Sequence, residues 1–225
     1  KAGLTVNKVI ADGFPFSLTI GIYASLVVVF AGILFGSVCA LRQNKLIDRF
    51  FMVLSTLGST IPSFVLATGF LFLFSKTLGL VPAFGVDEVA GYIGPVLVIG
   101  AFPLSFITRL TRTSLVEVQQ QDYIRTARSK GISEFKVIYK HALRNALLPV
   151  VTYIGPMVAS IVTGSFVIET VFGIPGVGQL FTDSIVNRDY PLIMGITVFF
   201  AVLLVLAVLI VDLVYVLIDP RIKLD

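Results

Sequence analysis

The sequence predicts an all-α polytopic membrane protein, and three observations support this fold class. Hydrophobic residues make up 56% of the 225 residues and charged residues only 13%, with a mean hydropathy of +0.98. A soluble domain would carry about 25% charged residues. The chain also contains five long runs without a charged residue. Its 19 glycines and 10 prolines fit membrane helices, which tolerate both residues.

The five charge-free runs predict five membrane helices. Each run reaches the roughly 20 residues that a helix needs to cross about 30 Å of hydrocarbon. A helix also satisfies its own backbone hydrogen bonds in lipid. We therefore expect one transmembrane domain over residues 1–225, with a polar loop at about 118–144. The expected spans are about 14–41, 50–75, 91–117, 145–169 and 190–218. Pro62, Pro95, Pro103, Pro149 and Pro156 lie in or near these spans and predict kinks.

The distribution of Lys and Arg predicts the orientation of the helices. Thirteen of the 17 basic residues lie in three segments, 42–49, 109–144 and 219–225. Loops rich in Lys and Arg stay in the cytoplasm, so we expect these segments and the C-terminus there. The start of the chain is then outside. Because it begins with Lys1 instead of Met, we expect a sixth membrane helix upstream.

The sequence predicts no catalytic, metal or nucleic-acid site. His141 is the only histidine, and the single Cys39 lies in an apolar run, so there is neither a His cluster nor a disulfide framework. No G-x-x-x-x-G-K-[ST] string occurs, so a nucleotide that drives this protein would bind elsewhere. The net charge of +4 is spread over short loops and not gathered on a soluble domain. We therefore expect no nucleic-acid partner, and no cofactor on this chain.

Two acidic residues, Glu169 and Asp212, lie near the ends of expected spans. Acids inside a membrane are functional candidates, but we expect Glu169 at the outer interface. Interfacial hydrogen bonding or snorkelling is favoured over proton coupling for both residues. A proton-coupled secondary transporter would place acids nearer mid-span and show an inverted repeat. A purely structural membrane anchor would leave the many Pro and Gly breaks unexplained.

The most informative polar stretch is residues 122–149, between the third and fourth spans. Asp122 is a good N-cap and Gly131 a good residue to follow a helix, which leaves room for about eight helical residues, roughly 12 Å. Ser133 then predicts the start of an amphipathic helix, which we expect to continue without a break into the span at Pro149. We expect the first, stub helix to dock on another protein. A basic loop resting on anionic lipid would explain the charges but not the capping residues.

A second unusual segment is the turn Phe172-Gly-Ile-Pro-Gly-Val-Gly178, on the expected outer side. Gly supplies backbone freedom and Pro fixes φ, so the segment predicts a compact non-helical turn. Such a turn at membrane depth is tolerated where it is buried in protein or lines a cavity. The spacing alone favours a gate and a tight connecting loop equally.

These strings carry a resemblance to a known family. Asp122-Tyr-Ile-Arg-Thr-Ala-Arg-Ser-Lys-Gly131, followed by His141-Ala-Leu-Arg-Asn-Ala-Leu-Leu-Pro149, resembles the cytoplasmic "EAA" loop of the permeases of binding-protein-dependent ABC importers. Nearly the whole chain is similar to the dipeptide/oligopeptide/nickel branch, and most of all to its first (B-type) oligopeptide permease subunits. Arg125-Thr126-Ala127 stands where the general pattern has Glu-Ala-Ala, so the acidic contact of that motif is not carried over. The further matching strings are Ile107-Thr-Arg-Leu-Thr-Arg112, Thr163-Gly-Ser-Phe-Val-Ile-Glu-Thr170, Phe172-Gly-Ile-Pro-Gly-Val-Gly178, Asn187-Arg-Asp-Tyr190 and Asp219-Pro-Arg-Ile222.

The resemblance implies a fold, a function and partners. The fold would be the type I transmembrane fold of ABC importers, in the bacterial cytoplasmic (inner) membrane. A second, homologous permease, two ABC ATPase subunits that bind ATP and Mg, and an extracytoplasmic substrate-binding protein would complete the machine. The cargo would be oligopeptides, moved by alternating access. Dipeptides, nickel chelates and glycosides are the alternative cargoes.

The resemblance also implies roles for three groups of residues. The stub helix would dock on an ATPase through Tyr123, Ile124, Arg125, Thr126, Ala127, Arg128, Ser129, Lys130 and Gly131. The loop continues through His141, Arg144, Asn145 and Pro149. The outer turn would contact the binding protein and help to gate the path through Phe172, Gly173, Pro175, Gly176 and Gly178.

Overall fold

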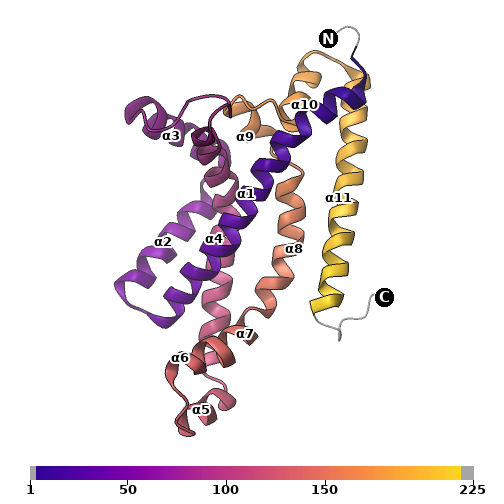
Figure 1. Ribbon diagram of the computed structural model, residues 1–225. Coiled ribbons are helices and arrows are strands. Elements are labelled where there is room, and N and C mark those ends of the chain that lie inside the picture. The colour runs from indigo at the N-terminus through magenta and orange to yellow at the C-terminus, as the bar shows by residue number, and fades with distance from the viewer. Residues whose placement is uncertain (1–3, 219–225) are drawn as a thin grey trace. The chain divides into compact units, whose positions relative to one another are not determined.

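The computed structural model describes residues 4–218, which form helices and no strand (Figure 1). The α-helices up to the polar loop are α1 (Val6–Leu41), α2 (Leu46–Thr60), α3 (Ser63–Phe70) and α4 (Ile93–Gln119). Those that follow are α5 (Asp122–Ser129), α6 (Glu134–Lys136), α7 (Leu143–Ala146), α8 (Leu148–Val162), α9 (Phe166–Val171), α10 (Val177–Val186) and α11 (Tyr190–Ile218). Two π-helical segments, Leu71–Thr77 and Val137–Ala142, and a 3-10 turn, Val89–Tyr92, complete the set.

The chain divides into two compact units. Of the described residues, the first unit comprises 4–26, 61–101 and 155–218, and the second comprises 27–60 and 102–154. The stub helix therefore lies in the second unit, and the turn at 172–178 lies in the first. The string at 219–222 and the C-terminus lie outside the described residues.

Three of the described helical stretches are long and apolar enough to cross a membrane, namely Val6–Leu41, Val89–Gln119 and Tyr190–Val211. Two pairs of bent helices, Leu46–Thr60 with Ser63–Thr77 and Glu134–Ala146 with Leu148–Val162, bring the number to five if each pair is one span. The expected number of five spans is compatible with this result and stays a prediction.

Two expected spans differ in detail from the helices. The span at 50–75 is interrupted at Pro62, which has extended backbone (φ −56°, ψ 142°) and separates α2 from α3. The span at 145–169 ends earlier, since α8 stops at Val162 and Gly164 takes a φ of +87°. Only glycine adopts that conformation without a steric penalty, so the helix cannot continue through it. By contrast, Pro103 and Pro156 lie inside helices α4 and α8.

Glycines allow α1 and α4 to pack closely in the second unit. A Cβ atom at Gly32 would lie 2.7 Å from Cγ2 of Ile107, and one at Gly36 would lie 2.5 Å from Cβ of Thr111. Small residues at helix contacts are typical of membrane proteins, where close backbone approach replaces the hydrophobic driving force. The polar loop follows directly after α4 and therefore starts from this close packing of α1 against α4.

Candidate functional site

The stub helix predicted from the sequence is α5, and its C-terminal end is a complete Schellman motif. Gly131 has a φ of +74°. Its N–H donates to the carbonyl of Arg128 at 3.0 Å, and Ile132 N–H donates to the carbonyl of Ala127 at 3.3 Å. These are the two hydrogen bonds that define the motif. The N-terminal expectation was wrong by one residue, because Gln121 is the N-cap and Asp122 lies in the first helical turn.

One face of α5 is anchored in the core of the second unit. Ile124 is fully buried and Ala127 is 8% exposed. They pack in a hydrophobic cluster whose other buried members are Ala40, Leu115, Val137, Ala142 and Ala146. Figure 1 shows α5, α6 and α7 gathered beyond the end of α4. The short helix is therefore stabilised by tertiary packing, since eight residues alone would not form a stable helix in water.

Two polar contacts cross-link α5 to the segment that follows it. Arg128 forms a bidentate ion pair with Glu134, with N–O distances of 2.7 and 3.2 Å. The hydrogen bond and charge of Arg128 lower the pKa of the Glu134 carboxyl. Asn145 donates from Nδ2 to the hydroxyl oxygen of Tyr123 at 2.9 Å. The helix is thus held at both ends, by Tyr123 and by Arg128.

The opposite face of α5 is exposed and polar. Its exposed residues are Asp122, Tyr123, Arg125, Thr126, Arg128, Ser129 and Lys130. The side chain of Arg125 is 73% exposed and makes only a 3.8 Å contact with Asp122. The structure therefore separates the predicted docking residues into two classes. Ile124 and Ala127 are buried and anchor the helix in the core, and the others, including Tyr123 and Arg128, form a surface that a partner can reach.

The expectation of an unbroken helix from Ser133 to the fourth span was wrong. Ser133 is an N-cap residue, but its side chain makes no capping hydrogen bond, and the helix then changes to π geometry over Val137–Ala142. A bend at Leu147 follows, before α8 begins. Pro149 supplies the physical reason, because it has no N–H to donate to the carbonyl of Asn145. Of the other loop residues named above, His141 is half-buried and Arg144 is exposed.

A buried ion pair in the same unit was not recognised from the sequence. The Asp48 side chain is 3% exposed and accepts from Nε and Nη2 of Arg112 at 2.6 and 2.7 Å. Asp48 also accepts from the N–H of Asn44 at 2.8 Å, which holds the α1–α2 turn, where Asn44 has a φ of +63°. The sequence placed both ionic groups in basic loop segments but gave no sign of their pairing.

The outer turn, in the first unit, is compact and largely buried. Helix α9 ends in a second Schellman motif, with Gly173 at a φ of +62° and Ile174 N–H bonded to the Glu169 carbonyl at 2.8 Å. Phe172 is 4% exposed and lies against the ring of Phe70. Of the five predicted gate residues, Pro175 alone is exposed, Gly173 is intermediate, and Phe172, Gly176 and Gly178 are buried.

Glu169 holds this turn by hydrogen bonds, and its expected position at the outer interface stays a prediction. Its side chain is almost fully buried, with the residue 1% exposed. Its Oε2 accepts from the N–H groups of Gly178 and Gln179 at 2.8 and 3.3 Å, at the start of α10. The Ser17 hydroxyl bonds to the same carboxylate and accepts from Val177 N–H at 2.9 Å. A carboxylate at a helix N-terminus is favoured by the helix dipole and satisfies N–H groups that the helix leaves free.

Three glycines make room for the Glu169 carboxylate. A Cβ atom at Gly164 would lie 2.7 Å from Oε1, and one at Gly178 would lie 2.9 Å from Oε2. A Cβ at Gly176 would overlap Oε2. The sequence signal was therefore present, since a lone acid stands among glycines in Thr163–Gly178, but the spacing alone did not show that they meet. Within residues 4–218, no three His, Cys, Asp or Glu residues are grouped so that they could hold a metal ion.

The comparisons with known proteins agree with this architecture. The family described as "Binding-protein-dependent transport system inner membrane component" matches residues 32–224. The chain is 50% identical over 224 residues to the dipeptide transport system permease protein DppB of Bacillus subtilis, with 100% of this chain and 73% of the relative covered. It is 43% identical over 221 residues to the oligopeptide transport system permease protein OppB of Haemophilus influenzae, covering 97% and 72%.

A solved structure shows the same fold. The inward-facing MetNI methionine ABC transporter matches with a TM-score of 0.74 at 16% identity, over 92% of this chain and 94% of the matched chain. This likeness confirms the all-helical transmembrane fold that was expected. Together, the family match and the relatives show that the chain belongs to the binding-protein-dependent ABC importer permeases of the inner membrane, as a multi-pass subunit similar to peptide permeases.

Proposed function

We propose that this permease subunit translocates oligopeptides, which a substrate-binding protein delivers, by alternating access coupled to separate ATPase subunits. The observation that carries the proposal is α5, a short helix with one face locked into the core and a polar face left exposed. The relatives named above support peptides as the cargo class, with dipeptides as the nearest alternative. Purification with the partners, followed by mass spectrometry, tests the assembly, and the ligand of the co-purified binding protein tests the cargo.

The ATPases are proposed to act on this chain through the exposed face of α5. Movement of a docked ATPase would reach the cluster around Ile124 and Ala127, because both residues are buried against the neighbouring segments. The ion pair of Arg128 with Glu134 and the bond from Asn145 to Tyr123 would carry the same movement. Since the connection to α8 is bent at Leu147, the transmission runs through packed contacts and not along one continuous helix.

The remaining partners and the orientation follow from the same proposal. A second, homologous permease and two ATPases that bind ATP and Mg would complete the translocation unit. Residues 42–49, 109–144 and the C-terminus would lie in the cytoplasm, as the positive-inside rule predicts. The outer turn at 172–178 would face the binding protein, with Pro175 as its exposed residue. Helix α11 would meet lipid or the second permease, since only 6% of its most apolar stretch is buried against the rest of the described chain.

Replacing Gly131 with valine is expected to uncouple transport from ATP hydrolysis. The change forces a β-branched residue into a φ of +74° and destabilises the Schellman motif that ends α5. Peptide uptake by the complex in proteoliposomes should fall at least about tenfold, while the chain still inserts and assembles, because a strained residue costs about 1–3 kcal/mol locally. Uptake and ATP hydrolysis are measured on the same preparation.

Gly79→Val is the matched control for this prediction. Gly79 is also exposed, has a φ of +63° and, like Gly131, has no neighbour within 4 Å of a built Cβ atom. The Gly79→Val variant therefore introduces the same kind of backbone strain at a position outside α5. Equal losses in the two variants, or unchanged uptake in Gly131→Val, would count against a coupling role for α5.

Arg125→Glu is expected to weaken binding of the ATPases without disturbing the fold of α5. The side chain is 73% exposed, so reversal changes the docking surface and leaves the buried face intact. Co-purification of the ATPases in detergent should fall about five- to tenfold, as expected for a charge reversed at an interface. Lys140→Glu, a charge reversal at another exposed position outside α5, is the control. Intact co-purification in Arg125→Glu would show that this face does not bind the ATPase.

A further inference from the structure

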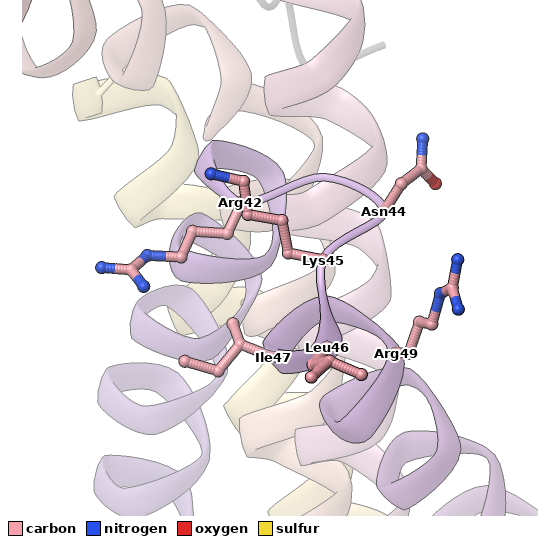
Figure 2. A pocket seen from close by; sticks show the side chains of 6 residues that line it. All are labelled: Arg42, Asn44, Lys45, Leu46, Ile47 and Arg49. Atoms are coloured by element: carbon pink, nitrogen blue, oxygen red, sulfur yellow. The ribbon is translucent and has the colours of Figure 1, made fainter.

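A basic turn joins α1 to α2 in the second unit and has no part in the function proposed above. Arg42, Lys45 and Arg49 are all exposed there. Figure 2 shows Arg42 and Arg49 pointing away from the turn toward opposite sides. In the part of the chain that the structure describes, none of these three side chains forms an ion pair. They line a shallow recess of about 510 Å³, together with Asn44, Leu46 and Ile47.

The acidic residue in this turn does not offset the positive charge at the surface. Asp48 is 2% exposed and its carboxylate is occupied by Arg112 and by the N–H of Asn44. The hydrogen-bonding groups of the Asp48 carboxylate are therefore used by partners within the protein. Three positive charges thus lie on a short exposed segment, and within residues 4–218 none of them is held in an ion pair, which is an arrangement that attracts an external anion.

Large apolar side chains lie among and beyond these cations. Leu46 is 84% exposed and Phe50 is 62% exposed, one helical turn apart on α2. The exposed apolar residues continue along α2 with Val53, Leu54 and Leu57. Cations at the end of an exposed apolar helix fit the boundary between lipid headgroups and acyl chains. An acidic soluble partner would match the cations but would leave the apolar side chains in water.

We infer that the basic turn binds the phosphate headgroup of anionic phospholipids. Because Arg42 and Arg49 point to opposite sides of the turn, they bind the phosphates of different headgroups by charge-assisted hydrogen bonds, and Lys45 adds a third cation between them. Leu46 and Phe50 enter the acyl region. The turn thereby fixes the depth of α1 and α2 in the anionic leaflet. This inference rests on the membrane orientation proposed above, but not on coupling to ATP or on the identity of the cargo.

The test places a fluorophore at the turn in the complete complex and measures which lipids approach it. Leu46→Cys offers an exposed position beside the cations, whereas the native Cys39 is fully buried. The complex without Leu46→Cys supplies the background from other cysteines. The labelled complex is reconstituted into nanodiscs that contain rising fractions of brominated phosphatidylglycerol or brominated phosphatidylcholine, and quenching is recorded without ATP or peptide.

Phosphatidylglycerol is expected to quench at a much lower fraction than phosphatidylcholine. Each Lys or Arg near an anionic surface contributes roughly a fivefold preference. Arg42→Gln/Lys45→Gln/Arg49→Gln should therefore raise the phosphatidylglycerol fraction at half quenching by at least about tenfold. Quenching by phosphatidylcholine should not change. Lys76→Gln/Lys136→Gln/Lys140→Gln removes the same number of exposed cations from segments outside the turn and outside α5, and should leave the preference intact.

Four results would overturn the inference. Equal quenching by the two lipids would show that the turn does not select anions, and no quenching by either would show that it faces an aqueous partner. An equal loss of the phosphatidylglycerol preference in the control triple variant would show that the preference depends on overall charge and not on the turn. Removal of the preference by millimolar glycerol phosphate would identify a site for a free anion. Because the assay needs no ATPase activity, its failure is distinct from failure of peptide transport, which the uptake assay reports.

Discussion

Glu169→Gln is expected to destabilise the outer turn and to reduce peptide uptake at least about tenfold. The carboxylate oxygen that now accepts from Gly178 and Gln179 becomes, in one orientation of the amide, a donor that faces two donors. In the other orientation the amide keeps one acceptor but loses the charge at the start of α10. Leaving a buried donor unsatisfied costs about 1–3 kcal/mol, so the melting temperature of the complex should fall by several degrees.

The effect on function should appear in the response to the binding protein. Loaded binding protein should stimulate ATP hydrolysis less in Glu169→Gln, because the turn that is proposed to face it loses its fixed shape. Gly176→Ala should give the same phenotype without changing any charge, since its Cβ would overlap Oε2 of Glu169. Glu117→Gln, at an exposed position of α4, is the matched control. A native melting temperature and native stimulation in Glu169→Gln would contradict the role assigned to this carboxylate.

Asp48→Ala is expected to cause the largest loss of stability among substitutions in the second unit. It leaves Arg112 without its partner in a place where the Arg side chain is only 22% exposed. Breaking a buried ion pair by removing one partner costs about 3–5 kcal/mol, and the partial exposure of Arg112 favours the lower end. The N–H of Asn44 loses its acceptor as well. Thermal unfolding of the purified complex measures the loss.

Removing both charges should recover much of this stability. In Asp48→Ala/Arg112→Met no unpaired ion remains, and an apolar pair of similar volume can replace a buried ion pair at little cost. A coupling free energy of about 2 kcal/mol or more is expected from the double-mutant cycle. Additive losses in the two single variants would show that the 2.6 Å contact contributes no net stability to the fold.

Local sequence patterns were enough to predict that the chain is a helical membrane protein and that it contains the short helix α5. Hydrophobic runs of about 20 residues are sufficient to predict membrane helices, because lipid demands long apolar segments that satisfy their own backbone. The end of α5 could be predicted to the residue. Glycine is favoured where a helix ends with a positive φ, and Gly131 takes that position. Its start at Asp122 was misplaced by one residue, because Gln121 takes the N-cap conformation without a capping side chain.

The continuation of that loop could not be predicted. The apolar and basic periodicities around Phe135 and Lys140 are helical, and nothing in them distinguishes α from π geometry. The change over Val137–Ala142 arises where Val137, Ala142 and Ala146 turn inward to cover Ile124 and Ala127. Pro149 predicted a kink near the bend at Leu147, but a proline does not by itself show that a helix ends, since Pro103 lies inside α4.

Composition and loop charge were thus enough to establish a multi-pass helical membrane protein, and short strings were enough to indicate its family. Only the folded chain revealed what Glu169 and Asp48 do. Glu169 meets Ser17, 152 positions earlier in the chain, and Asp48 meets Arg112, 64 positions later. Contacts over such separations leave no periodicity in a single sequence. They depend on where helices cross, and crossing is decided by side-chain packing throughout a unit and not by any local pattern.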